Sequence, residues 1–149
     1  FYSFTSGGEA LSIAAAIATI NEIEKKKVIN IIWKRGKYLQ LKVRALIIKN
    51  NLEHILALKG APCWQILNIS KTKNCSDLEI KSFLQQELIQ EGILWNGQHN
   101  LNFSHTKKDI NELVQAYSDI LPELKAHIKS NTLKKKLRGK LITNIFKVR

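Results

Sequence analysis

The residues best suited to chemistry stand close to the start of the chain. Thr5, Ser6, Gly7 and Gly8 come directly before Glu9 and an alanine-rich apolar stretch. Hydroxyl groups and glycines at a helix start leave backbone N–H groups free, and the helix dipole adds positive potential, so this segment could hold a phosphate. The same residues also fit an ordinary capping box, with Ser6 as the cap and Glu9 as its partner. Taken alone, the pattern is more often a cap.

Two histidines form the next candidate group. His99 and His105 are six positions apart, which would place both on one face of an extended strand and permit a shared site. A structural metal ion needs further ligands and no third one accompanies them, so we expect no metal site. We expect His105 to flank a helix and His99 to lie near an active-site mouth or on the surface. His54 and His127 are expected on the surface, and the three tryptophans in the core or an interface.

Cysteine usage and hydropathy narrow the class of protein. Cys63 and Cys75 are the only cysteines, and they form neither a CxxC pair nor a set with nearby histidines, which argues against zinc. We expect both to be reduced thiols in a cytoplasmic protein, because nothing else indicates secretion. The longest apolar run, residues 11–20, is far shorter than the roughly 20 residues that cross a bilayer, so no membrane association is expected.

The net charge of +12 is the extreme property of the composition. A basic excess of this size can indicate nucleic acid or another anionic partner. Only the C-terminal region is markedly basic, however, and aromatic residues are not interleaved with the basic ones as a base-stacking surface requires. The sequence therefore weighs against a nucleic-acid partner.

The elements that would position these residues begin with two helices. Residues 9–24 are apolar around much of the helix circumference, which indicates that this helix packs inside something larger. Residues 28–49 have an approximate helical period, with Gly36 as a weak point. Two further helices start at capping boxes, Ser76–Glu79 and Thr106–Asp109, and the first of them stops near Gly92.

Short β-prone runs lie between the helices, at residues 55–58, 64–69, 93–95 and 101–104, with a last one at 142–148. Gly60-Ala61-Pro62 is a turn signal that predicts a hairpin from the first two runs. From residue 28 onward the order is helix, strands, helix, strands, helix. This order predicts an α+β domain with helices on one face of a small, mostly antiparallel sheet.

The start of the chain also resembles a known family. Residues 1–16 are similar to the segment that follows the cofactor lysine in class III pyridoxal-phosphate-dependent aminotransferases, and most of all to that of glutamate-1-semialdehyde 2,1-aminomutases. The shared order is aromatic residue, hydroxyl, threonine, small residues and alanine-rich helix. Less specific similarity continues through residues 28–39, 83–94 and 105–110, so the resemblance covers essentially the whole chain.

The resemblance implies the C-terminal part of a fold-type I pyridoxal-phosphate enzyme. Residues 1–27 would be the end of the large cofactor-binding domain and residues 28–149 the C-terminal small domain. Thr5 would bind the phosphate of pyridoxal 5'-phosphate held by the neighbouring subunit of a homodimer. Ser6 and Gly7 would add backbone donors.

The resemblance also implies what the chain lacks. The family's catalytic lysine, which forms the internal aldimine, would precede Phe1, because no lysine here lies in a matching motif. The start at Phe1 and the lack of methionine indicate a cut point. The longer enzyme would move an amino group between small substrates, or within one as an aminomutase does, and this chain alone would be inactive.

One departure from the family pattern keeps other interpretations open. Residues 99–104 contain no arginine, which many members of the class use there to grip a substrate carboxylate, and this argues against a simple α-amino-acid substrate. The alternative to an enzyme is a non-catalytic remnant, or a basic binding module associated with nucleic acid.

Overall fold

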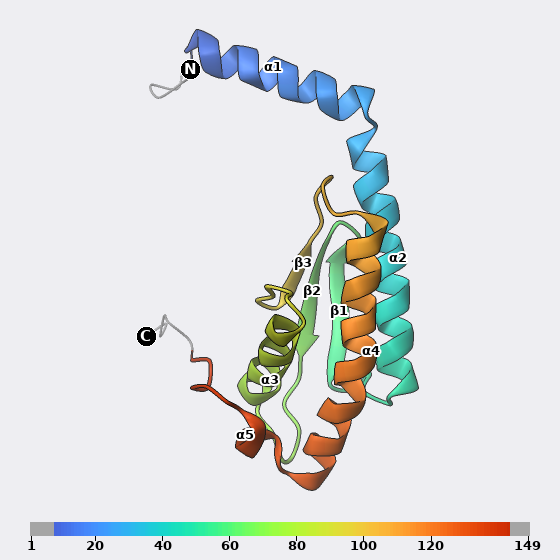
Figure 1. Cartoon of the computed structure of the whole chain (residues 1–149), viewed down its shortest axis with the longest axis vertical. Coiled ribbons are helices and arrows are strands. Elements are labelled where there is room, and N and C mark those ends of the chain that lie inside the picture. The colour runs from blue at the N-terminus through green and yellow to red at the C-terminus, as the bar shows by residue number, and fades with distance from the viewer. Residues whose placement is uncertain (1–7, 144–149) are drawn as a thin grey trace.

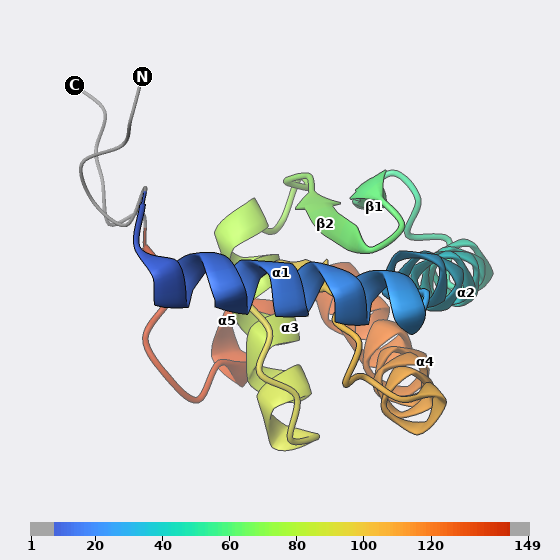
Figure 2. The same ribbon diagram turned by 90° about the horizontal axis from the view of Figure 1, so that it is seen from above.

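The computed structural model describes residues 8–143. Helix α1 projects away from the rest of the molecule, which is a small sheet with helices packed against it (Figure 1). Seen from above, α3 and α4 lie on one side of the sheet and α2 lies beside β1 (Figure 2). The predicted α+β architecture is confirmed. The elements are α1 (Ala10–Lys25), α2 (Val28–Lys49), β1 (Leu56–Ala61), β2 (Trp64–Ile69), α3 (Asp77–Gln90), β3 (Gln98–Asn100), α4 (Lys107–Ser130) and α5 (Leu133–Lys136).

The sheet has three antiparallel strands in the order β1-β2-β3. The predicted hairpin is confirmed, with Leu58 opposite Leu67 and Ala61 opposite Trp64. Pro62 and Cys63 therefore make the turn, one position later than the glycine signal indicated. Alternate residues point to opposite faces, so Leu67 is buried under the helices whereas Trp64 is 56% exposed on the open face.

The strands expected at residues 93–95 and 101–104 are wrong, because the strand in this part of the chain is β3, which lies between them. Trp95 is 2% exposed and anchors an irregular segment in the core. After Leu101 the side chain of Asn102 accepts hydrogen bonds from the N–H groups of Ser104 and His105, which turns the backbone away from the sheet. Local side-chain hydrogen bonds of this kind compete with a strand ladder.

The core lies between the sheet and the inner faces of three helices. One face of α4 is apolar and lies in the core, where all of its large apolar side chains are buried except Val114 and Ile128, which are partly buried. Both predicted capping boxes are present, at Ser76 with Glu79 and at Thr106 with Asp109. The principal buried side chains are Leu39, Val43, Ile47, Ile80, Phe83, Leu84, Leu88, Ile110, Leu113, Tyr117, Leu121 and Leu124.

Helix α2 continues through Gly36, and the absence of a side chain there lets the hairpin approach the helix. A Cβ atom at Gly36 would lie 1.9 Å from the carbonyl oxygen of Pro62. The buried side chain of Gln65 reinforces this approach, because its Nε2 donates to the carbonyl oxygens of Gly36 at 2.9 Å and Pro62 at 2.6 Å. The backbones of the helix and the turn are therefore in contact, and the Gln65 side chain joins them.

Helix α1 has no such packing. None of its residues is buried, and Leu11, Ile17 and Ile20 are 77%, 56% and 54% exposed. This agrees with the expectation that the helix needs partners beyond the chain. None of the helices in residues 8–143 combines the length and apolar character that a membrane span requires.

We predict that Gly36→Ala lowers the free energy of unfolding by about 1–3 kcal/mol, because the methyl group meets a backbone carbonyl that cannot move without opening the hairpin. Urea titration of the full chain, followed by circular dichroism, would measure this. Gly139→Ala is the matched control, since nothing lies within 4 Å of its added Cβ, and it should change stability by less than about 0.5 kcal/mol. Equal effects of the two substitutions would contradict the close approach.

We predict that the amides of α1 exchange hydrogen much faster than those of α2 in the isolated chain, because exposed helices without tertiary packing are marginal in water. Hydrogen-exchange mass spectrometry of the 149-residue chain measures both helices in one experiment. Protection of residues 11–20 equal to that of residues 39–47 in a monomer would contradict the prediction.

Candidate functional site

The predicted phosphate-binding residues Thr5, Ser6 and Gly7 lie outside the described residues. The structure does describe how α1 begins. The predicted capping box from Ser6 to Glu9 is wrong, because Glu9 itself is the N-cap. Its carboxylate accepts from the N–H groups of Leu11 at 3.1 Å and Ser12 at 2.7 Å. The sequence favoured Ser6 as the cap because short hydroxyl side chains are the usual N-caps. The longer Glu9 side chain also reaches the N–H groups of the first helical turn.

This cap changes the electrostatics of the helix start. Hydrogen bonds from the hydroxyl and the backbone N–H of Ser12 lower the pKa of the Glu9 carboxyl, which is therefore ionised at neutral pH. The positive end of the α1 dipole is then offset by a side chain of the helix itself. The N–H groups of Leu11 and Ser12 are therefore already occupied and do not face a phosphate group.

His99 is buried, which corrects the expectation that it lies near a site mouth or on the surface. It is 4% exposed, and its Nε2 lies 2.9 Å from the hydroxyl oxygen of Tyr117 on α4. His105 lies beyond the strand and flanks α4 as predicted, where its Nδ1 accepts from the N–H of Asn102 at 3.1 Å. The two histidines therefore share no strand face. No cluster of three metal-ligating side chains occurs among residues 8–143.

Burial sets the protonation state of the His99–Tyr117 pair. Desolvation lowers the pKa of His99 to about 4 and raises the pKa of Tyr117, so both side chains are neutral at pH 7. The His99 Nδ1 and the Trp95 Nε1 have no hydrogen-bond partner within the described part of the chain. The pair is a polar contact within the core.

Of the other expectations for histidine and tryptophan, some are confirmed and one is wrong. His127 is half-buried, with its ring 5.7 Å from that of Phe83, so its predicted surface position is wrong. His54 is exposed as expected. Trp95 is a core residue as predicted, whereas Trp33 is 41% exposed. Cys63 and Cys75 are free thiols, and burial raises the pKa of the Cys75 thiol.

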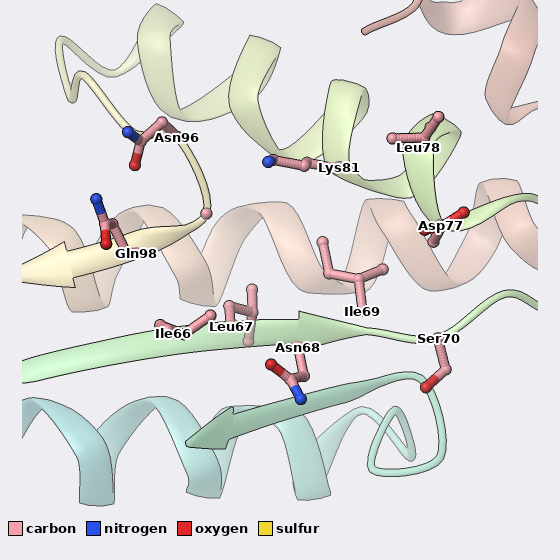
Figure 3. Close-up of a pocket in the computed structure, with 11 residues that line it drawn as sticks. Ile66, Leu67, Asn68, Ile69, Ser70, Asp77, Leu78, Lys81, Asn96 and Gln98 are labelled. Carbon is pink, nitrogen blue, oxygen red and sulfur yellow. The ribbon is translucent and has the colours of Figure 1, made fainter. Parts of the chain in front are cut away.

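A polar pocket of about 500 Å³ lies between the end of β2 and the start of α3 (Figure 3). The α3 wall presents Asp77 and Lys81, and the segment that enters β3 presents Asn96 and Gln98. This pocket was not predicted from the sequence. The only signal for it was the spacing of four between Asp77 and Lys81, which puts both on one face of a helix.

Comparison with known proteins places these features in a fold. No family model matches the chain. In sequence it is 29% identical over 131 residues to an acetylornithine aminotransferase of Caldanaerobacter subterraneus subsp. tengcongensis. In structure it matches, with a TM-score of 0.70 and 18% identity, the pyridoxal-phosphate internal aldimine form of the FumI protein of Sphingopyxis sp. MTA144.

The matches cover 83% and 87% of this chain, respectively, but the chain spans only 31% of the length of either relative. They confirm the resemblance: the chain shares its fold with one part of a protein of the pyridoxal-phosphate-binding class. Within that class, the chain resembles the C-terminal part of a class III aminotransferase, of which the acetylornithine enzyme is the relative matched in sequence.

We predict that the chain loses about 3 kcal/mol of stability through His99 as the pH falls from about 6.5 to about 4. The unfolded chain binds a proton at the ordinary pKa near 6.5, and the folded chain binds it only near 4. The unfolded state therefore holds more protons in this window, and stability rises with pH across it.

Urea titrations at several pH values would measure this loss, with His99→Gln as the comparison because an amide does not take up the proton. The variant should be less stable at pH 7 but should show a flatter pH dependence between 6.5 and 4. Parallel curves for the two proteins would show that His99 does not titrate as its burial requires.

Proposed function

We propose that the chain is the C-terminal part of a longer pyridoxal-phosphate-dependent enzyme that moves an amino group, either between small substrates or within one substrate. The observation that carries the proposal is the fold shared with a pyridoxal-phosphate protein over 87% of the chain. The 29% identity to an acetylornithine aminotransferase over 131 residues supports the reaction class independently of the fold.

The distribution of buried residues supports a division of the chain at residue 27. From α2 onward the helices and the sheet enclose one core, whereas α1 contributes no buried residue. Lys27 between them has a left-handed backbone with φ of 51°, which breaks the helical path. We therefore propose residues 28–149 as the small domain and residues 1–27 as the end of a larger cofactor-binding domain.

In this proposal Thr5, Ser6 and Gly7 hold the phosphate of pyridoxal 5'-phosphate. The Thr5 hydroxyl and the backbone N–H groups of the three residues would donate to phosphate oxygens, since Glu9 already occupies the N–H groups of Leu11 and Ser12. When bound, the cofactor supplies an electron sink for the carbon that carries the amino group. The lysine that attaches it would lie upstream of Phe1.

Two further parts of the proposal are the particular reaction of the enzyme and its oligomeric state. We propose an enzyme close to the glutamate-1-semialdehyde 2,1-aminomutases, on the similarity of residues 1–16, although the relative matched in sequence is named as an aminotransferase. We further propose a cytoplasmic homodimer, in which Thr5 contacts the cofactor of the neighbouring subunit. Amino-group transfer to an added keto acid would separate the two reactions, because an aminomutase completes its reaction within one substrate.

The first experiment is to read the coding sequence immediately upstream of Phe1 in frame. A large domain with a lysine a few dozen residues before Thr5 would support the proposal. A stop codon or unrelated sequence at that place would contradict it and leave the non-catalytic remnant.

We predict that Thr5→Val in the longer protein raises the dissociation constant for pyridoxal phosphate about tenfold, because a hydrogen bond to a charged group contributes roughly 1.5–3 kcal/mol. Cofactor absorbance during dialysis against graded cofactor concentrations would measure it. Thr19→Val is the control, since the Thr19 hydroxyl donates within α1 to the carbonyl oxygen of Ala15 at 2.8 Å. Unchanged affinity in the Thr5 variant would exclude Thr5 as a phosphate ligand.

A further inference from the structure

The end of β2 has an unpaired edge. The Leu67 N–H donates to the carbonyl oxygen of Gly97 at 2.9 Å, just before β3 begins. The Ser70 N–H points the other way and donates to Ile55 beside β1 at 2.8 Å. Because backbone groups alternate along a strand, Ile69 faces the β3 side, where no strand continues. Its N–H and C=O have no partner within residues 8–143.

The polar pocket runs along this free edge (Figure 3). One wall is the second half of β2 together with Ser70, which follows it, and the other is the first turns of α3. A groove between the edge of a strand and a helix is a shape that accepts an extended peptide as an additional strand.

The two ends of the groove differ in charge. Lys81 lies at the Gly97 end, where a Cβ atom on Gly97 would come within 3.4 Å of the Lys81 Nζ. The side-chain amides of Asn96 and Gln98 lie at the same end, and Asp77 lies at the opposite end near Ser70 (Figure 3). The groove therefore has a cation with two amides at one end and a carboxylate at the other.

These two charges do not pair with each other. Asp77 and Lys81 are four residues apart on α3, a spacing that elsewhere in the described chain gives the ion pairs Lys26–Glu22 at 2.6 Å and Lys108–Glu112 at 3.7 Å. No ion pair joins Asp77 to Lys81, and the Lys81 ammonium makes no hydrogen bond within residues 8–143. Both groups are free to meet charges on a ligand.

We propose that this groove binds the C-terminal residues of an extended peptide as a fourth strand, antiparallel to β2. The peptide would exchange hydrogen bonds with the N–H and C=O of Ile69. Its terminal carboxylate would lie at Lys81, Asn96 and Gln98, and a basic residue upstream would lie near Asp77. Strand geometry of about 3.3 Å per residue gives room for about three peptide residues along Leu67 to Ser70.

The charge pattern fixes this direction. β2 runs from the Lys81 end of the groove toward the Asp77 end. A peptide antiparallel to β2 therefore ends at the ammonium group. A parallel peptide would begin there, with its own positive charge against Lys81, and like charges brought together are unfavourable. The inference does not depend on pyridoxal phosphate, because none of these residues belongs to the proposed phosphate-binding segment.

The test uses the full 149-residue chain labelled with ¹⁵N and two synthetic probes. These are the peptide acetyl-Lys-Thr-Val with a free C-terminal carboxylate and the same peptide with a C-terminal amide. We expect the free acid to bind about tenfold more tightly than the amide, as a charge-assisted contact requires. The backbone amide signal of Ile69 should move on titration.

Variants separate the proposed contact from general charge effects. Lys81→Gln should abolish the difference between the two peptides, and Lys81→Arg should retain it. Lys59→Gln makes the same charge change on the outer face of β1, where Lys59 is exposed, and should leave the difference intact. The Lys81→Arg variant keeps the test decisive if Lys81→Gln fails to fold.

Several results would overturn the proposal. One is equal affinity for the acid and the amide, and another is no binding of either below about 1 mM. An equal loss with Lys59→Gln would show that net charge alone drives binding. Acetate binding as tightly as the peptide would show an anion site without strand addition, as would a stationary Ile69 signal.

Discussion

The structure depends on the backbone contact between Gly36 of α2 and the turn at Pro62. Helix and hairpin approach so closely there that no side chain fits, and the buried Gln65 amide links the two carbonyl oxygens. A buried polar side chain costs free energy unless it is hydrogen-bonded, so this one strongly favours a single arrangement of hairpin and helix. The two-residue turn fixes the register of β2 on β1, and β3 pairs with β2 on its other side.

Elements with strong local signals could be predicted from the sequence. The α2 bounds, the hairpin and both capping boxes follow from periodicity and from side chains that bond to nearby backbone, such as Thr106 and Asp109. The path from residue 92 to 105 could not be predicted. Its course depends on burial of Trp95 and His99 against α4, and such contacts between distant segments leave no periodic pattern in the sequence.

The candidate sites also differ in how far the sequence predicts them. The chemistry of a hydroxyl–glycine segment can be inferred from the residues alone, but the sequence did not indicate that Glu9 would cap α1. The pocket beside α3 joins residues from two strands, a helix and a loop, so its composition emerges only when the sheet is assembled. In contrast, the resemblance to aminotransferases was visible because a short segment carries several of the family's features together.

The direction of α1 relative to α2 is set by the backbone of a single residue, Lys27. Its left-handed backbone, with φ of 51°, is a conformation that residues with side chains adopt at a cost, and it sets the direction in which α1 leaves the domain. Helix α1 has 16 residues and is therefore about 24 Å long. A rotation about the two backbone dihedral angles of Lys27 would move the far end of α1 through a wide arc. A change in the backbone of this one residue would therefore reorient the whole helix relative to the domain.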